Sequence, residues 1–116
     1  MSTVKFDKRV AEFYLQKMQS AADRGLEFTL TLTQVKNILR AKRCQLTGMP
    51  LVNEPKSPWR VTIDRIDNKK GYVAGNVAAV AWCVNSAKSL FENPTSSVDF
   101  SILHKMSKEL TKRGVK

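Results

Sequence analysis

Two aspartates near the middle of the chain, Asp64 and Asp67, are the first residues whose type and surroundings suggest chemistry. They stand among four basic residues, which are Arg60, Arg65, Lys69 and Lys70. One interpretation is a set of surface ion pairs, with Asp67 forming an Asx turn with the residues after it. The other is a site for a hard cation, in which Asp64 gives an oxygen ligand to Mg²⁺ or a similar ion beside a phosphate held by the bases. Their spacing alone leaves both interpretations open.

The net charge of the chain favours a polyanionic partner. Its 116 residues carry 20 Lys and Arg against 10 Asp and Glu, which gives a net charge of +10. Residues 31–90 hold ten bases and three acids, an excess of +7, so most of the charge lies in the middle of the chain. Nucleic acid fits this excess better than a membrane surface, because no basic amphipathic anchor is evident. A generic solubilising surface is the alternative that charge alone leaves open.

Length and composition predict one globular domain spanning residues 1–116. The hydrophobic fraction of 42% and the charged fraction of 26% exclude wholesale disorder. No apolar run approaches the roughly 18–20 residues of a membrane span. The first residues lack the apolar core of a signal peptide, so we expect a cytoplasmic protein. In that reducing compartment Cys44 and Cys83 are expected to be free thiols.

The positioning elements begin with an N-terminal part, 1–43, in which hydrophobic periodicity predicts two helices. The first covers residues 4–24 and is suited to end at Gly25. Its apolar stripe comprises Val10, Phe13, Tyr14, Met18 and Ala21. The second is shorter and opens with Thr31-Leu32-Thr33-Gln34, which fits a capping box.

The central part, 44–90, and the final part, 91–116, complete a predicted α+β fold. The central part reads, in order, as a knuckle at 44–51, a loop at 53–58, a strand at 59–64, a turn at 67–71, a strand at 76–80 and a helix at 81–90. The final part reads as one helix from a cap at Ser96 or Ser97 to Arg113. Its apolar stripe comprises Phe100, Leu103, Met106 and Leu110.

From Cys44 to Lys88 the sequence resembles the HNH endonucleases, the small ββα-metal nucleases common in bacteriophages and mobile elements. Four ordered motifs carry the resemblance: Cys44-x-x-Thr47-Gly48-x-Pro50-Leu51, Ile63-Asp64-Arg65-Ile66-Asp67, Gly71-Tyr72-Val73-x-Gly75-Asn76-Val77 and Asn85-x-x-Lys88. The resemblance implies a ββα-metal core with flanking N- and C-terminal helices. It also implies cleavage or nicking of DNA phosphodiester bonds with Mg²⁺ or another divalent cation.

The resemblance also assigns roles to individual residues. Asp64 matches the first metal ligand of the family and Asn85 the second. Asn76 matches the Asn that fixes the catalytic loop, and Lys88 matches a base that faces the nucleic acid. Four further bases are expected to bind nucleic acid around this cleft: Arg43, Arg60, Lys69 and Lys70. The residues alone favour a simpler interpretation, in which Asn76 is a turn residue and Asn85 an exposed helix residue.

Arg65 departs from the family, because it stands where the catalytic His belongs. A guanidinium stays protonated at any workable pH and cannot act as a general base. It can still hold a phosphate oxygen or stabilise the transition state, so Arg65 stays among the predicted catalytic residues, with Asp67 and Asn76. Asp67 is then the nearest candidate to activate water, with Tyr72 as a further one. His104, the only histidine, falls in the final helix, where we expect a partly exposed helix residue.

Zinc is a second departure. Many relatives clamp the knuckle with two Cys-x-x-Cys pairs, whereas this chain has at most one cysteine at a ligand position, and four-coordinate zinc needs more. We therefore expect no structural zinc. Cys44 is expected to be a small buried hydrophobe, with Trp59 and Trp82 supplying much of the apolar area.

The change at Arg65 leaves two functions open. The first is a divalent-metal-dependent endonuclease of phage or mobile-element type, acting on DNA rather than RNA. The second is a catalytically inactive HNH-fold protein that binds nucleic acid, or a host or phage protein, without cutting. The pair of Asp64 and Asn85 favours the enzyme, because a pure binder has no reason to keep both oxygen ligands.

Overall fold

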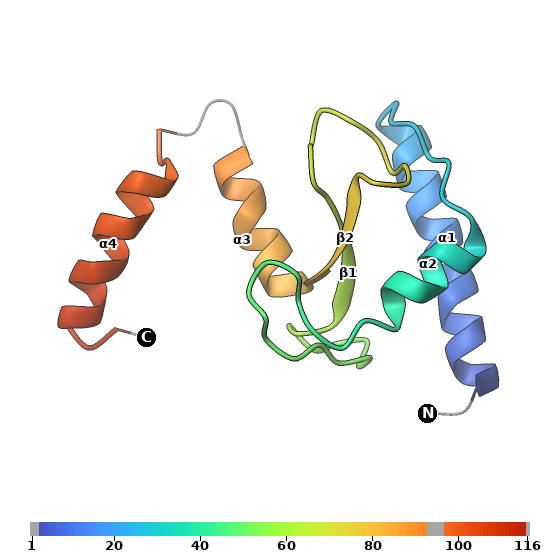
Figure 1. Ribbon diagram of the computed structural model, residues 1–116, viewed down its shortest axis with the longest axis horizontal. Coiled ribbons are helices and arrows are strands. Elements are labelled where there is room, and N and C mark those ends of the chain that lie inside the picture. Colours follow the sequence, from blue (N-terminus) through green and yellow to red (C-terminus); the bar gives the residue numbers. More distant parts are fainter. Residues whose placement is uncertain (1–2, 93–96, 116) are drawn as a thin grey trace. The chain divides into compact units, whose positions relative to one another are not determined.

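The computed structural model describes residues 3–92 and 97–115, and within these ranges it has an α+β fold (Figure 1). The elements are α1 (Thr3–Asp23), α2 (Leu32–Leu39), β1 (Val61–Arg65), β2 (Val77–Ala81), α3 (Trp82–Glu92) and α4 (Phe100–Lys112). This order confirms the predicted fold class. The chain forms two compact units, one ending at Asn85 and the other beginning at Ser86, and each is described by itself. The division of the chain at 43/44 and 90/91 stays a prediction.

Gly25 ends α1, as the sequence predicts. Its φ of +67° lies in the left-handed region that glycine adopts without strain. The Gly25 N–H donates to the carbonyl of Ala22 at 3.1 Å, and the Leu26 N–H donates to the carbonyl of Ala21 at 2.8 Å. These two bonds close the last turn, so the helix stops here and the chain turns back.

Thr31 caps α2 through the predicted capping box. The Gln34 N–H donates to Thr31 Oγ1 at 3.1 Å, and the Thr31 N–H donates to Gln34 Oε1 at 2.8 Å. The cap orients the short helix so that Val35 and Leu39 are buried. Because eight residues form few internal hydrogen bonds, this burial rather than propensity supplies most of the stability of α2.

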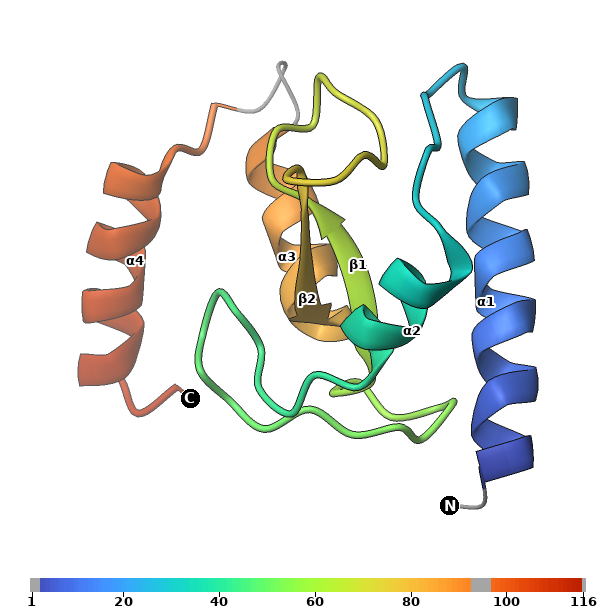
Figure 2. The ribbon, with the colours of Figure 1, turned by 45° about the vertical axis from the view of Figure 1, so that its right-hand side comes forward.

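β1 and β2 form an antiparallel pair in which Ile63 lies opposite Ala79 and Asp64 lies opposite Ala78. Successive side chains of a strand point to opposite faces. One face, with Val61, Ile63 and Ala79, joins the main apolar cluster. From α1 and α2 that cluster receives Val10, Ala21, Val35 and Leu39. Figure 2 shows these two helices on one side of the sheet.

The other face of the sheet, with Thr62, Asp64 and Val80, borders a smaller apolar cluster. Cys44, Val80 and Ala81 are its buried members, and Trp59 and Val84 pack against them. The expectation for Cys44 is confirmed, since its exposed fraction is 1%. The expectation for Trp82 is wrong: 43% of it is exposed. Trp82 is not among the residues packed against this cluster, and its ring instead lies under the guanidinium of Arg60.

The knuckle that follows α2 is closed by backbone hydrogen bonds. The Cys44 N–H donates to the Met49 carbonyl at 2.8 Å, and the Gly48 N–H donates to the Cys44 carbonyl at 2.7 Å. Burial raises the pKa of the Cys44 thiol, but hydrogen bonds with the Thr47 side chain and with nearby backbone groups outweigh it. The net effect is a pKa below the usual value of a thiol.

The second unit contains α4, whose cap is Asp99. The Ile102 N–H donates to Asp99 Oδ1 at 2.9 Å. The predicted cap at Ser97 is therefore wrong, and Ser96 lies outside the described residues. A carboxylate at this position also interacts favourably with the positive end of the helix dipole, which explains why α4 begins after Asp99 rather than after Ser97. His104 is exposed on α4. Over the described ranges, no helix has the length and apolar character needed to cross a bilayer.

Candidate active site

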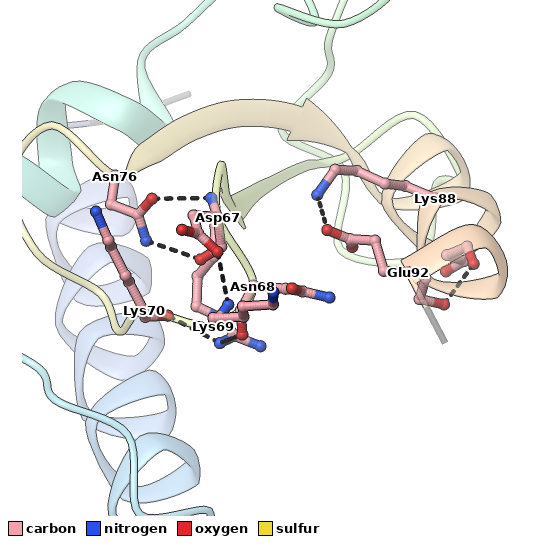
Figure 3. Close-up of polar contacts among 10 residues, drawn as sticks. Asp67, Asn68, Lys69, Lys70, Asn76, Lys88 and Glu92 are labelled. Atoms are coloured by element: carbon pink, nitrogen blue, oxygen red, sulfur yellow. Dashed lines mark hydrogen bonds and ion pairs between the residues drawn. The ribbon is translucent and has the colours of Figure 1, made fainter. Parts of the chain in front are cut away.

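Asn76 organises the loop between β1 and β2. Its exposed fraction is 7%, and its amide makes three hydrogen bonds within the loop. Oδ1 accepts the Asp67 N–H at 2.9 Å, while Nδ2 donates to the carbonyls of Asp67 at 3.1 Å and Gly71 at 2.9 Å. Figure 3 shows the two-way contact with Asp67. The structure thus places Asn76 at the centre of the loop that follows Asp64, and its predicted part in catalysis stays a prediction.

Asp67 makes the Asx turn that the sequence allowed. Its Oδ1 accepts the Lys69 N–H at 2.9 Å, and its carbonyl accepts the Lys70 N–H at 3.1 Å (Figure 3). This turn leaves both lysines exposed on the loop. Two cations are therefore held close together on a loop whose backbone is fixed by Asn76.

Arg65 holds the same loop from its other side. Its Nη1 donates to the carbonyls of Asn68 at 2.7 Å and Lys70 at 2.9 Å. Its guanidinium also lies over the Tyr72 ring, 5.6 Å from the centroid. Because side chains alternate along β1, Arg65 shares the face of Ile63 and not that of Asp64. The sequence predicted that Arg65 holds a phosphate oxygen of the substrate, and this stays a prediction. The contacts in the structure show that Arg65 also positions the loop.

Tyr72 belongs to the apolar cluster next to α1. It is 4% exposed, and its hydroxyl accepts a hydrogen bond from Arg24 Nη2 at 2.9 Å. The Tyr72 N–H donates to the Glu27 carbonyl at 2.8 Å, which ties this part of the loop to the segment after α1. The close fit leaves no space at the preceding Gly71, where an added Cβ would lie 2.2 Å from the Glu27 carbonyl oxygen. Tyr72 is therefore buried with its hydroxyl oxygen bonded to Arg24, and its role as a group that activates water stays a prediction.

Thr62 links β1 to the start of α3. Its hydroxyl donates to the Val80 carbonyl at 2.7 Å and accepts a hydrogen bond from Asn85 Nδ2 at 3.2 Å. Asp64, which is 4% exposed, lies two residues further along the same face of β1. The structure therefore brings Asp64 and Asn85 to the same side of the sheet, with Thr62 beside both. Sequence reasoning missed Thr62, although its position two residues before Asp64 was a usable signal.

The donor atoms on this face fit a hard cation. A carboxylate and an amide oxygen are ligands that Mg²⁺ accepts, and Mg²⁺ keeps several waters in most protein sites. The bond to Thr62 uses the nitrogen of Asn85 and does not consume its amide oxygen. Among residues 3–92 and 97–115 no group of three or more His, Cys, Asp or Glu residues could hold a metal. Mg²⁺ commonly takes one or two protein oxygens and fills its remaining positions with water and phosphate oxygens.

The remaining predicted bases have different surroundings. Arg43 donates from Nη1 to the Gly48 carbonyl at 3.1 Å on the exposed side of the knuckle. Arg60 donates to the Ser57 carbonyl at 2.9 Å, and its guanidinium lies 4.5 Å from the centroid of the Trp82 ring. Both residues belong to the first unit. Their predicted contacts with nucleic acid stay predictions.

Lys88 lies in the second unit and forms an ion pair with Glu92. Their side chains approach to 2.7 Å and are only 18% and 25% exposed (Figure 3). The acid lies one helical turn after the base, a spacing that favours such pairs. Glu92 therefore offsets much of the charge that Lys88 would present to a phosphate, and its predicted contact with nucleic acid stays a prediction.

Comparison with known proteins supports the fold and leaves the family open. No protein-family model matches the chain. Over 70 residues, or 60% of its length, the chain is 37% identical to an uncharacterized 29.0 kDa protein encoded in the dda-modA intergenic region of Enterobacteria phage T4. The chain spans 28% of the length of that phage protein. Its fold is similar to that of the rare-cutting HNH restriction endonuclease PacI, with a TM-score of 0.56 and 16% identity over 92% of this chain and 82% of PacI.

Proposed function

We propose that this chain is an HNH-type nuclease that cleaves or nicks DNA phosphodiester bonds with a divalent metal ion. The observation that carries the proposal is the placement of Asp64, which is buried on the β1 face whose Thr62 is bonded to Asn85 of α3. Asp64 and Asn85 thus both lie next to Thr62 near the junction of the sheet and α3, and the similarity of the fold to that of an HNH endonuclease supports the same proposal. The net charge of +10 supports a nucleic-acid substrate.

Mg²⁺ or another divalent cation is the proposed cofactor, held by Asp64 and Asn85. When bound, such an ion polarises the scissile phosphate and stabilises the leaving 3′-oxygen without redox chemistry. The chain supplies the rest of the site. Asn76 and Arg65 fix the loop after β1, so that Lys69 and Lys70 are held in place for neighbouring phosphates.

Asp67 is the proposed general base. Arg65 cannot take a proton, and the hydroxyl of Tyr72 already accepts a hydrogen bond from Arg24. The contact between Asp67 and the Lys69 N–H uses one carboxylate oxygen and leaves the other for a water proton. The carboxylate would accept that proton as the water oxygen attacks phosphorus, and the bond to the leaving 3′-oxygen would break.

The similarity to a phage protein supports a phage or mobile-element origin, and with it action in the cytoplasm of a bacterial host. DNA is the proposed partner because PacI, with its similar fold, is a restriction endonuclease. Sequence specificity and a protein partner are not part of the proposal.

A second candidate function is binding of nucleic acid or of a host protein without cleavage. Arg65 favours this second function. It stands where HNH endonucleases have the histidine that acts as general base, and its guanidinium is instead bonded to two loop carbonyls. A loop fixed in this way can present Lys69 and Lys70 to phosphates whether or not a metal is bound. The two functions share a binding surface and differ in whether the Asp64 site is used.

Supercoiled plasmid separates the two functions. The pure protein is incubated with Mg²⁺, Mn²⁺ or EDTA, and open-circular DNA is measured on a gel. The proposal requires nicking with a divalent ion, none with EDTA, and loss of nicking in Asp64→Ala. Asp23→Ala is the matched control, because it removes an exposed carboxylate at the end of α1. Binding without nicking under every condition would establish the second function, and an active Asp64→Ala variant would refute the assigned metal site.

A further inference from the structure

A basic groove lies outside the candidate active site, between the N-terminal half of α1 and the loop before β1. Its volume is about 650 Å³. Four bases line it, which are Lys5, Lys8, Arg9 and Arg60, against two acids, Glu12 and Glu54. Arg9 holds the two walls together by donating to the Asn53 carbonyl. Figure 2 shows the loop reaching the lower turns of α1. The excess of bases makes the groove attractive to an anion.

The two lysines of the groove can reach a ligand. Lys5 and Lys8 lie one turn apart on α1, and both are exposed. The ion pair of Lys8 with Glu12 is long, at 4.0 Å, and its side chains are 77% and 60% exposed. Such an exposed pair contributes little free energy, so a phosphate can replace Glu12 at little cost. Residues 1–30 have nearly balanced charge, with five bases and four acids, so their composition does not indicate a basic groove.

Arg60 connects this groove with the candidate active site. Besides lining the groove, its guanidinium stacks on Trp82, whose ring is 43% exposed. Trp82 and Asn85 are three residues apart on α3 and so lie on the same side of the helix. Asn85 in turn contacts Thr62 beside Asp64. A series of contacts within the first unit therefore links the predicted metal ligands to the basic groove, through Thr62, the exposed ring of Trp82 and Arg60.

We propose that the nucleic-acid strand entering the candidate active site continues across Trp82 and Arg60 into this groove, where Lys5 and Lys8 hold its backbone phosphates. Arg60 directly precedes β1 and lies four residues before Asp64, so about 13 Å of extended chain, at about 3.3 Å per residue, separates the groove from the predicted metal ligands. The exposed ring of Trp82 offers a stacking surface between the two contact points. The proposal rests on the proposed function for its nucleic-acid partner, but it does not require cleavage.

Two double variants with equal charge loss test the groove. Lys5→Gln/Lys8→Gln removes the groove lysines, and Lys105→Gln/Lys108→Gln removes two exposed lysines from α4. Binding of a fluorescent 20-base-pair duplex is measured by anisotropy over a range of salt concentrations. Loss of two phosphate contacts should lower the slope of log affinity against log salt by about 1.8, at about 0.9 per phosphate. The α4 variant should keep the parental slope. Equal slopes in the two variants, or no binding by the parent, would overturn the proposal.

The position of Trp82 provides a second readout. The chain has two tryptophans, so Trp59→Phe leaves Trp82 as the only one. If the strand crosses Trp82, oligo(dT) should quench its fluorescence, and the quench should weaken in the Lys5→Gln/Lys8→Gln background at equal DNA concentration. A quench of the same size and midpoint in that background would contradict the proposed path. Plasmid nicking is scored separately: a parent that shows the groove effects without nicking would support the groove and refute the nuclease.

Discussion

Asn76 and Asp67 bind each other in both directions: the Asp67 N–H donates to Asn76 Oδ1, and Asn76 Nδ2 donates back to the Asp67 carbonyl. The buried Asn76 amide therefore makes hydrogen bonds to the backbone of the loop after β1 that a neighbouring strand would make in a sheet. Because the amide also reaches Gly71, one side chain fixes both arms of the loop. A loop held in this way can keep charged groups at a constant distance from Asp64.

Asn76→Ala should cost about 2–4 kcal/mol of unfolding free energy, because it leaves one N–H and two carbonyls of the loop without their partner. Urea unfolding followed by circular dichroism measures this loss. Asn37→Ala is the matched control, since it removes an exposed amide from α2 and should change stability by no more than about 0.5 kcal/mol. A loss of the same small size in both variants would contradict the role of Asn76.

Local patterns made much of this fold predictable. The apolar stripe of α1, Gly25 and the Thr31 capping box each depend on residues within one or two turns of one another, so the sequence alone indicates them. The sequence also indicated the two β-prone segments that form β1 and β2, although the loop that joins them is longer than the predicted turn. Only the resemblance to HNH endonucleases predicted that Asp64, Asn76 and Asn85 belong to one site. Their spacing along the chain does not show which of them lie close together.

Other features depend on contacts between distant segments. Whether Met18 or Trp82 is buried depends on the depth of the neighbouring surface, and both are more exposed than their hydrophobicity predicts. The groove needs α1 to meet the loop before β1, which neither segment indicates alone. The contacts of Arg65 with the loop carbonyls depend on which face of β1 it occupies. The sequence around Arg65 predicted only a contact with a substrate phosphate. The cap at Asp99 was missed because serine and aspartate are about equally good cap residues.

Thr62→Val should lower the nicking rate about 10–100-fold with little change in DNA affinity. The substitution keeps the shape of the side chain but removes the hydroxyl that orients Asn85. Loss of such a partner of a metal ligand has effects of this size. Single-turnover nicking over a range of Mn²⁺ concentrations measures the rate and the apparent affinity for metal. Thr62→Ser keeps the hydroxyl and should recover most of the activity, whereas a failure of this rescue would assign the defect to packing.

Nucleic-acid binding should depend steeply on salt. With roughly four to six phosphate contacts, affinity should fall about a hundredfold or more between 50 and 200 mM salt, at a slope of about 0.9 per phosphate. Fluorescence anisotropy measures this dependence. Lys69→Gln/Lys70→Gln should lower the slope by about 1.8, because both exposed lysines sit on the fixed loop. A nearly flat salt dependence of the parent would indicate a protein partner instead.

Arg65→Ala should lower the nicking rate about 10²–10³-fold if the guanidinium reaches the scissile phosphate, the effect of removing one transition-state donor. The variant should also lose about 1–2 kcal/mol of stability, because two bonds to loop carbonyls are lost at a partly exposed position. Single-turnover kinetics and urea unfolding measure the two effects. Arg65→Lys keeps the charge but not the fork of donors, so it should recover less than a tenth of the lost rate. Parental activity in Arg65→Ala would exclude a role at the phosphate.

Arg65→His decides between the enzyme and the inactive binder. It places an imidazole, with a pKa near 6.5, at the position of the base in HNH endonucleases. If the parent is an enzyme in which Asp67 activates water, the substitution removes the loop contacts of Arg65 and should reduce nicking. If the parent has lost catalysis but keeps the Asp64 and Asn85 ligands, the imidazole should create nicking that rises between pH 6 and 7.5, as the ring loses its proton. The plasmid assay with Mg²⁺ or Mn²⁺ measures both outcomes. Absence of cleavage by the parent and by Arg65→His would refute the nuclease and leave nucleic-acid binding as the function of this fold.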